Sequence, residues 1–167
     1  LGASTTEAQA FAAVDVARQV IDVFKGQPAR YAVNAPFISA ESLPVLAPFI
    51  KVATTLGQLV SQLAEGQMRS VKIKYEGDIS NYDTTALKAI VLGGLLEQIS
   101  EERVNLVNAN LVACQRGITV AEQKVPTCEN YISLITVEAA SETGTTTAAA
   151  TVMRAETHIV RINNYWI

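Results

Sequence analysis

Apolar residues recur at helical spacing in the earlier part of the chain, and alternating or β-branched runs dominate its last third. The first helical pattern covers residues 5–25. Ser4 and Glu7 form an S-x-x-E capping box at its start, and Gly26 followed by Pro28 ends it. The apolar stripe is wide for a solitary helix, so we expect it to pack against another copy of the chain or against its own domain. The stripe consists of Phe11, Val14, Val16, Ala17, Val20, Ile21 and Phe24.

A linker and a second helical region follow this first helix. Residues 27–39 contain two prolines and predict an extended linker, which we interpret as a boundary between two packing units. Beyond the linker, Pro44 and Pro48 interrupt the next helical pattern, because proline is tolerated in a first turn and not deep in a helix. We therefore expect a short helical turn at 41–46 and a separate helix at 48–64.

The remaining elements predict an α+β domain in which a mostly antiparallel sheet packs against helices on one side. Apolar and charged residues alternate over 71–76, which predicts a half-exposed strand. A helix with Asp83 as its N-cap is predicted at 83–99. Its Gly93-Gly94 pair indicates either close packing of another backbone or a break. The further predicted elements are a short helix at 111–116, strands at 118–125, 131–140, 145–153 and 158–162, and a hairpin turn at 141–145.

Composition and charge narrow the functional classes. Apolar residues make up 49% and charged residues 17% of the chain, which is a globular composition. The net charge is -3 and the basic residues are scattered, so a nucleic-acid partner is not expected. There is no run of 18 apolar residues and no signal-peptide pattern, so we expect no membrane span and a cytoplasmic location. Cys114 and Cys128 lack metal-ligand spacing and are interpreted as free thiols, so no metal site is expected.

Candidate chemistry is sparse. There is no G-x-G-x-x-G fingerprint and no phosphate-binding P-loop, and a single histidine leaves no serine with a base in view. The cluster Arg154, His158 and Arg161 is suited to a small anion, since guanidinium groups match carboxylate and phosphate. On a straight strand the three residues do not share a face, so a bend at 155–157 would be needed. The alternative is that these charges simply face water.

Several stretches along the chain resemble segments of one enzyme family. The first is LGASTTEAQ at the start of the chain, which is similar to the segment that follows the catalytic histidine in that family. The helix and linker VARQVIDVFKGQPARYAVNAP come next, and then the helix LAPFIKVATTLGQLVSQLAEG. The later matches are VNLVNAN, NYISLITVEAAS and HIVRINNY. In their order and spacing these stretches cover essentially the whole chain, and together they resemble the long-form D-3-phosphoglycerate dehydrogenases.

The resemblance implies that residues 1–34 are the last loop and helix of the catalytic region and that residues 35–167 are the intervening, or allosteric substrate-binding, domain. The Rossmann domain and the catalytic histidine are then expected upstream and the ACT domain downstream, so this piece has no catalytic residue. Leu1, Gly2 and Ala3 match positions that lie against the nicotinamide ring. The parent enzyme would oxidise 3-phosphoglycerate with NAD in serine biosynthesis, and no NAD is expected to bind to the piece alone.

The resemblance also implies partners. A homo-oligomer, dimer or tetramer, is expected, with a regulatory site for a small anion such as phosphate or phosphoglycerate. His158 replaces a lysine and Tyr165 an arginine of such a site, which weakens it, and Asn110 replaces a proline in a turn. One alternative is a stand-alone ligand-binding or dimerisation module. Another is a dehydratase-type enzyme, but two cysteines cannot supply its iron–sulfur cluster.

Overall fold

The computed structural model describes residues 5–24, 38–101 and 103–167. The chain divides into two compact units, Leu1–Phe37 and Ile38–Ile167, and each is described here by itself. Part of the predicted capping box lies outside the described residues, because it includes Ser4.

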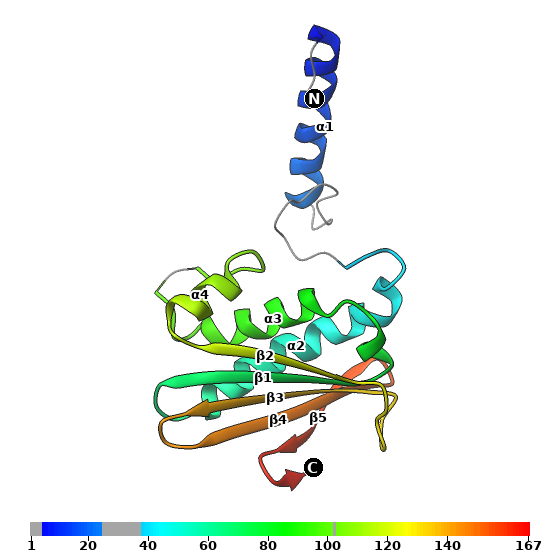
Figure 1. Ribbon diagram of the computed structural model, residues 1–167. Coiled ribbons are helices and arrows are strands. Elements are labelled where there is room, and N and C mark those ends of the chain that lie inside the picture. Colours follow the sequence, from blue (N-terminus) through cyan, green and yellow to red (C-terminus); the bar gives the residue numbers. More distant parts are fainter. Residues whose placement is uncertain (1–4, 25–37, 102) are drawn as a thin grey trace. The chain divides into compact units, whose positions relative to one another are not determined.

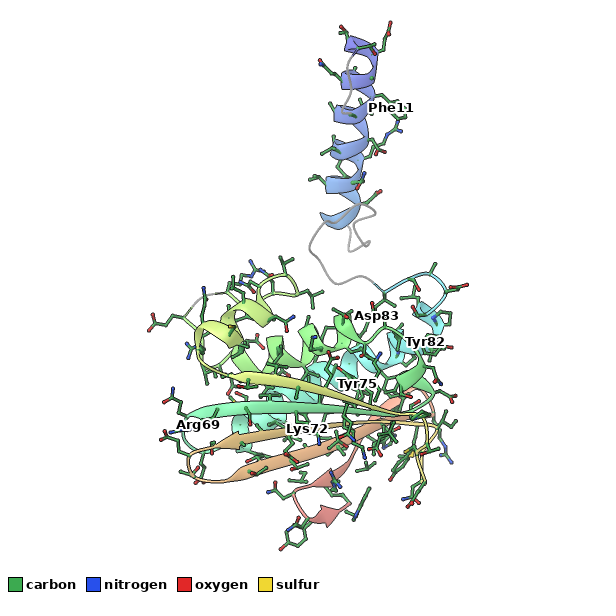
Figure 2. All side chains as sticks on the ribbon, viewed as in Figure 1. Phe11, Arg69, Lys72, Tyr75, Tyr82 and Asp83 are labelled. Atoms are coloured by element: carbon green, nitrogen blue, oxygen red, sulfur yellow. The ribbon has the colours of Figure 1, made fainter. Side chains whose placement is uncertain are left out.

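The described part of the first unit is one helix, α1 (Thr6–Phe24). The Thr5 hydroxyl accepts a hydrogen bond from the amide of Ala8 at 3.2 Å, which satisfies one amide of the first turn. Phe11, Val14, Val16, Val20 and Ile21 of the predicted apolar stripe are exposed, and Figure 2 shows Phe11, which is 77% exposed, projecting from the helix. Among the described residues of this unit, these five side chains therefore have no apolar cover.

The second unit is an α+β domain, as predicted, with one six-stranded sheet in the order β2-β1-β3-β4-β5-β6. The pairing between β1 and β2 is parallel and the other four pairings are antiparallel. The helical elements are α2 (Leu43–Leu63), η1 (Asp78–Asn81), α3 (Thr85–Leu96) and α4 (Ala109–Gln115). The strands are β1 (Met68–Gly77), β2 (Thr119–Val125), β3 (Ser133–Ser141), β4 (Thr145–Met153), β5 (Glu156–Ile162) and β6 (Tyr165–Trp166).

One face of the sheet carries the core, because the helices α2, α3 and α4 all pack against it (Figure 1). In β1 the apolar residues Val71, Ile73 and Tyr75 are buried in this core, whereas Lys72 and Lys74 lie on the opposite face. This alternation is the one predicted for residues 71–76. The main core cluster draws its other members from all three helices and from strands β3 and β4.

Helix α2 differs from the prediction, because it is continuous through both prolines. Pro44 lies in its first turn and Pro48 inside it. The amide that Pro48 lacks would have bonded the carbonyl of Pro44, four residues earlier, so one hydrogen bond of the first turns is lost. Burial of Leu46, Phe49 and Val52 around this position compensates for the loss.

The apolar character of α2 is explained by its packing. Among the described helices, α2 is the one that is long and apolar enough to cross a membrane by length and composition, with a mean hydropathy of 1.5. Seven of its residues are buried in the domain, and its neighbours are α3 and the strands β3, β4 and β5. Its apolar residues therefore form part of the core of the domain.

The contact between α2 and α3 depends on two glycines that face each other. A Cβ on Gly94 would lie 2.9 Å from the carbonyl oxygen of Thr54 and 3.1 Å from the amide nitrogen of Gln58. A Cβ on Gly57 would collide with the carbonyl oxygen of Val91. The neighbouring Gly93 has no atom within 4 Å of its Cβ position. The close packing suggested by the Gly93-Gly94 pair is therefore real and belongs to Gly94.

Helix α3 begins at Thr85 and ends at Leu96, so it is shorter at both ends than predicted. Asp83 precedes its N-cap residue, Thr84. The Asp83 Oδ1 atom accepts hydrogen bonds from the amide of Thr85 at 3.0 Å and from its hydroxyl at 2.6 Å (Figure 2). These two bonds, the side-chain one first, lower the pKa of Asp83. Asp83 thus supplies the predicted capping interaction from one position earlier.

Replacement of the two adjacent glycines of α3 should have opposite effects. In Gly94→Ala the new methyl group meets the backbone of α2, and overpacking of this kind costs about 1–3 kcal/mol of unfolding free energy. In Gly93→Ala the methyl group is free of contacts and removes the helix penalty of glycine, so the free energy of unfolding should rise by up to about 1 kcal/mol. Urea denaturation of both variants measures the two differences. Equal effects of the two substitutions would contradict the close contact between α2 and α3.

Removal of the Asp83 carboxylate should destabilise the domain by about 1 kcal/mol at neutral pH, the usual value for a lost helix cap. Because folding lowers the pKa of Asp83 below its ordinary value of 3.8, its stabilisation is complete above that value and is lost as pH falls through the folded-state pKa. The difference in urea midpoint between the wild-type chain and Asp83→Ala should therefore shrink on acidification. Glu65→Ala, which removes an exposed carboxylate after α2, serves as the control. A difference that stays constant down to acidic pH would refute the assignment.

Candidate functional site

Polar side chains cross the helix-free face of the sheet in one row. Strand register places Lys74 of β1 opposite Thr136 of β3, and Thr136 opposite Ala149 of β4. Ala149 is in turn opposite Arg161 of β5, and Arg161 is opposite Trp166 of β6. Directly opposite residues of paired strands point to the same face. The row therefore brings Lys74 to the same surface as Arg161 and Trp166, although Lys74 is far from both in the sequence.

A bulge in β5 controls which residues reach this surface. Ala150 is opposite Ile159, but the preceding residue Ala149 is opposite Arg161, so Val160 is an extra residue in β5. His158, which is opposite Thr151, and Arg161 therefore lie on the same face, although three residues separate them. The sequence suggested that a bend at 155–157 would be needed to bring these residues to one face. The bulge at Val160 does this for His158 and Arg161.

The turn between β4 and β5 is a tight two-residue hairpin. Arg154 and Ala155 form it with positive φ angles of 52° and 63°. Such angles at both central residues are the geometry of the primed turns that join twisted antiparallel strands. Arg154 is consequently an exposed loop residue and not a strand residue.

The segment after β2 folds over the row and closes one side of a pocket. Cys128 and Tyr131 pack on Leu134, Ala149 and Val160, which form a small second hydrophobic cluster on this face. The resulting pocket has a volume of about 280 Å³. Its lining is Lys74, Glu76, Val125, Thr127, Cys128, Glu129, Asn130, Tyr131, Leu134, Thr136, Arg161 and Trp166.

The charges in the pocket are held in place by neighbours. Lys74 Nζ forms an ion pair with Glu76 Oε1 at 2.8 Å. The guanidinium of Arg161 stacks over the Trp166 ring, 5.4 Å from its centroid. The Nε atom of Arg161 is buried and has no hydrogen-bond partner among the described residues. A buried donor without a partner is unfavourable, so the pocket offers Arg161 as a donor that is still to be satisfied.

Of the residues predicted for an anion site, Arg161 lines this pocket. His158 shares its face of the sheet and Arg154 lies in the hairpin turn, and neither is a lining residue. Leu1, Gly2 and Ala3, predicted to lie near the cofactor, are outside the described residues. Lys74 and Trp166 also line the pocket, but the sequence did not identify them as candidates. The alternation along 71–76 did place Lys74 on the polar face, but the order of strands that brings it near Arg161 cannot be read from the sequence.

A second group of charged residues ties β2 to the start of α3. Glu122 accepts hydrogen bonds from the Thr84 hydroxyl at 3.2 Å and from Lys88 Nζ at 2.7 Å. Lys124 Nζ donates to the carbonyl oxygen of Tyr82 at 2.6 Å. These contacts are complete within the domain and position the helix.

The hydroxyl of Tyr75 lies near the same region. Burial, and to a smaller extent the charge of Glu122, raises the pKa of Tyr75 far above its usual value, so the phenol stays protonated. Its hydroxyl has no hydrogen-bond partner among the described residues.

Neither metal nor disulfide chemistry is indicated in the part of the chain that the structure describes. It contains no group of three His, Cys, Asp or Glu side chains placed to hold a metal ion. Cys114 is exposed and Cys128 is half-buried, and both are free, as predicted. The pocket with Arg161 is therefore the candidate functional site.

Comparison with known proteins places the chain in a family. Residues 45–163 match the family model described as the D-3-phosphoglycerate dehydrogenase intervening domain. The chain is 43% identical over 145 residues to the D-3-phosphoglycerate dehydrogenase of Synechocystis, which covers 86% of this chain and 26% of that protein. It is 34% identical over 165 residues to the enzyme of the same name from Archaeoglobus fulgidus, covering 99% of this chain and 31% of that protein. For the Bacillus subtilis enzyme of this name, identity is 34% over 166 residues, which covers 99% of this chain and 32% of that protein.

The chain thus spans between a quarter and a third of the length of these relatives. The matched segment begins within α2 and ends just after β5, so it contains every element that builds the pocket except β6. On this evidence the chain belongs to the D-3-phosphoglycerate dehydrogenase family, and its residues 45–163 correspond to the intervening domain of that family.

Proposed function

We propose that the chain is part of an NAD-dependent D-3-phosphoglycerate dehydrogenase of L-serine biosynthesis, which oxidises 3-phosphoglycerate to 3-phosphohydroxypyruvate in the cytoplasm. The observation that carries this proposal is the match of residues 45–163 to the intervening domain of that family. The names of the relatives, each of which the chain matches over most of its own length, support it. Residues 1–34 would be the end of the catalytic region and residues 35–167 the intervening domain.

In this proposal residues 38–167 act in regulation and subunit contact, and the groups that transfer hydride and protons belong to other parts of the enzyme. The character of the described side chains supports this division. The single histidine, His158, lies on β5 and has no hydrogen bond to a carboxylate among the described residues, and the phenol of Tyr75 is closed off inside the core. Neither side chain is placed to exchange a proton with a substrate.

The division predicts that the 167-residue chain by itself does not reduce NAD in the presence of 3-phosphoglycerate. A spectrophotometric assay of NADH formation tests this, with the Bacillus subtilis D-3-phosphoglycerate dehydrogenase as the positive control. Turnover by the chain above the enzyme-free rate would overturn the division of roles.

The regulatory part of the proposal is a small-anion site in the pocket at Arg161. A half-buried arginine whose Nε donor is buried and unsatisfied is suited to a phosphate or carboxylate oxygen, because charge-assisted hydrogen bonds to arginine are strong and directional. Lys74 adds a second positive charge on the same row of the sheet, although its ion pair with Glu76 partly neutralises it. Phosphate and 3-phosphoglycerate are both small enough for a pocket of about 280 Å³.

The position of this pocket suits a sensor. Its walls come from β1, the end of β2, the segment after β2, β3, β5 and β6, so an anion bound there would lie where six parts of the domain meet. Binding would hold Arg161 and Trp166 against the segment that carries Cys128 and Tyr131. The ligand would thereby favour the closed arrangement of that segment over any more open one.

Isothermal titration calorimetry with phosphate and with 3-phosphoglycerate at constant ionic strength tests the anion site. Arg161→Gln should weaken binding at least about tenfold, a loss of roughly 1.4 kcal/mol, because it removes the charge-assisted donor. Arg154→Gln is the matched control, since it removes the same charge from the exposed hairpin turn next to the strand. Similar losses in the two variants, or none in Arg161→Gln, would refute the site.

A further inference from the structure

We propose that β2 pairs with β2 of a second copy of this chain in antiparallel orientation, centred on Gln123, so that two sheets join into one. This inference deepens the subunit-contact role proposed above by naming the surface that makes the contact. It rests on the free edge of the sheet, on the pattern of charges along β2 and on the contacts that hold those charges in place.

The free edge is the first observation. Strand β2 is the terminal strand of the sheet, and in the described part of the chain its strand pairing is with β1 alone. Five of its seven residues are exposed. Alternate amide and carbonyl groups of such a strand point away from its neighbour and can accept another strand. The strand itself contains no proline and no bulge that would prevent pairing, and Pro126 follows directly after its end.

The charges along β2 select one register. In a two-fold antiparallel pair each residue faces a partner at the same distance beyond the centre. Centring on Glu122 or on Lys124 would set two like charges opposite each other, which is unfavourable. Centring on Gln123 instead sets Glu122 opposite Lys124 of the second copy, twice, and sets Ala121 opposite Val125 twice. The strand is therefore complementary to itself in one register.

The two charged side chains point to the same face, because Glu122 is opposite Ile73 and Lys124 is opposite Tyr75 in β1. Both are held at the edge by the contacts to Thr84, Lys88 and the Tyr82 carbonyl described above. A carboxylate can accept further hydrogen bonds, and an ammonium group has three hydrogens to donate, so both retain capacity for a partner. Prior ordering also removes much of the entropic cost that makes exposed ion pairs weak.

Disulfide trapping tests the register directly. With Cys114 and Cys128 replaced by serine, Gln123→Cys places the two new thiols opposite each other across the two-fold axis. Directly opposite residues of antiparallel strands have Cα atoms about 4.5–5.5 Å apart, within the range that a disulfide spans. Ala121→Cys, on the same face two residues away, is the matched control, since its two copies would be roughly 13 Å apart.

Under mild oxidation, Gln123→Cys should form a covalent dimer on a denaturing non-reducing gel, and Ala121→Cys should remain monomeric. A Gln123→Cys chain that stays monomeric, or equal cross-linking of the two variants, would overturn the proposal. Association through the apolar stripe of α1 would not distinguish these two positions, so it cannot mimic the expected result.

The charge pattern is tested in the Gln123→Cys background. Lys124→Glu places two carboxylates opposite each other and should slow cross-linking at least about tenfold. Glu122→Lys combined with Lys124→Glu restores opposite charges and should recover the rate, whereas Lys51→Glu on the exposed face of α2 should leave it unchanged. Retention of the fast rate in Lys124→Glu would contradict the register. None of these outcomes alters the family match on which the dehydrogenase proposal rests.

Discussion

The domain depends on the one-sided burial of strand β1. It pairs with β2 in parallel and with β3 in antiparallel orientation, so it is the strand through which both parts of the sheet are joined. Its residues Val71, Ile73 and Tyr75 are almost completely buried under the helices, and a shift of one residue would send all three to the polar face. The helices must in turn approach closely enough to cover this row, which the contact between Gly57 and Gly94 allows. Register in β1 and the narrow spacing between α2 and α3 are thus two aspects of the same core.

Because the helices cover one face, the other face is left for polar chemistry. This polar face is only partly covered, by the segment that carries Cys128 and Tyr131 and by the two-residue strand β6. A deep apolar core cannot form there, so buried polar atoms such as the Nε of Arg161 persist at its margins. The bulge at Val160 is what turns Arg161 toward this face. Without it, the guanidinium would point into the core, where its desolvation would be far less favourable.

Local pattern predicted the elements of the fold well and their spatial order poorly. The alternation of 71–76 and the β-branched runs after residue 130 identified strands, since side-chain period is a local property. The prolines of α2 led to a wrong prediction of two separate helical segments, because burial around Pro48 outweighs the lost hydrogen bond. Burial of that kind depends on what packs against the helix, which the local sequence does not show. For the same reason the chemistry of Arg161 made it a candidate for the anion site, whereas Lys74 and Trp166 were not predicted. Lys74 shares a surface with Arg161 because of the sheet order β1-β3-β4-β5, and no short stretch of sequence encodes that order. Trp166 faces Arg161 across the short hairpin between β5 and β6.

The proposed anion site and the proposed subunit contact share a physical path. Lys74, in the row that leads to Arg161, is also the register partner of Gln123, the centre of the proposed pairing. Val125 and Thr127 line the pocket, and Val125 would face Ala121 of the second copy. An anion that draws Lys74 away from Glu76 would change the charge next to the seam between the two sheets. By thermodynamic linkage, joining the sheets would then alter the affinity for the anion by the same factor. In these two proposals a single row of side chains, running from the edge strand to the stacked Arg161 and Trp166, would connect ligand binding with assembly.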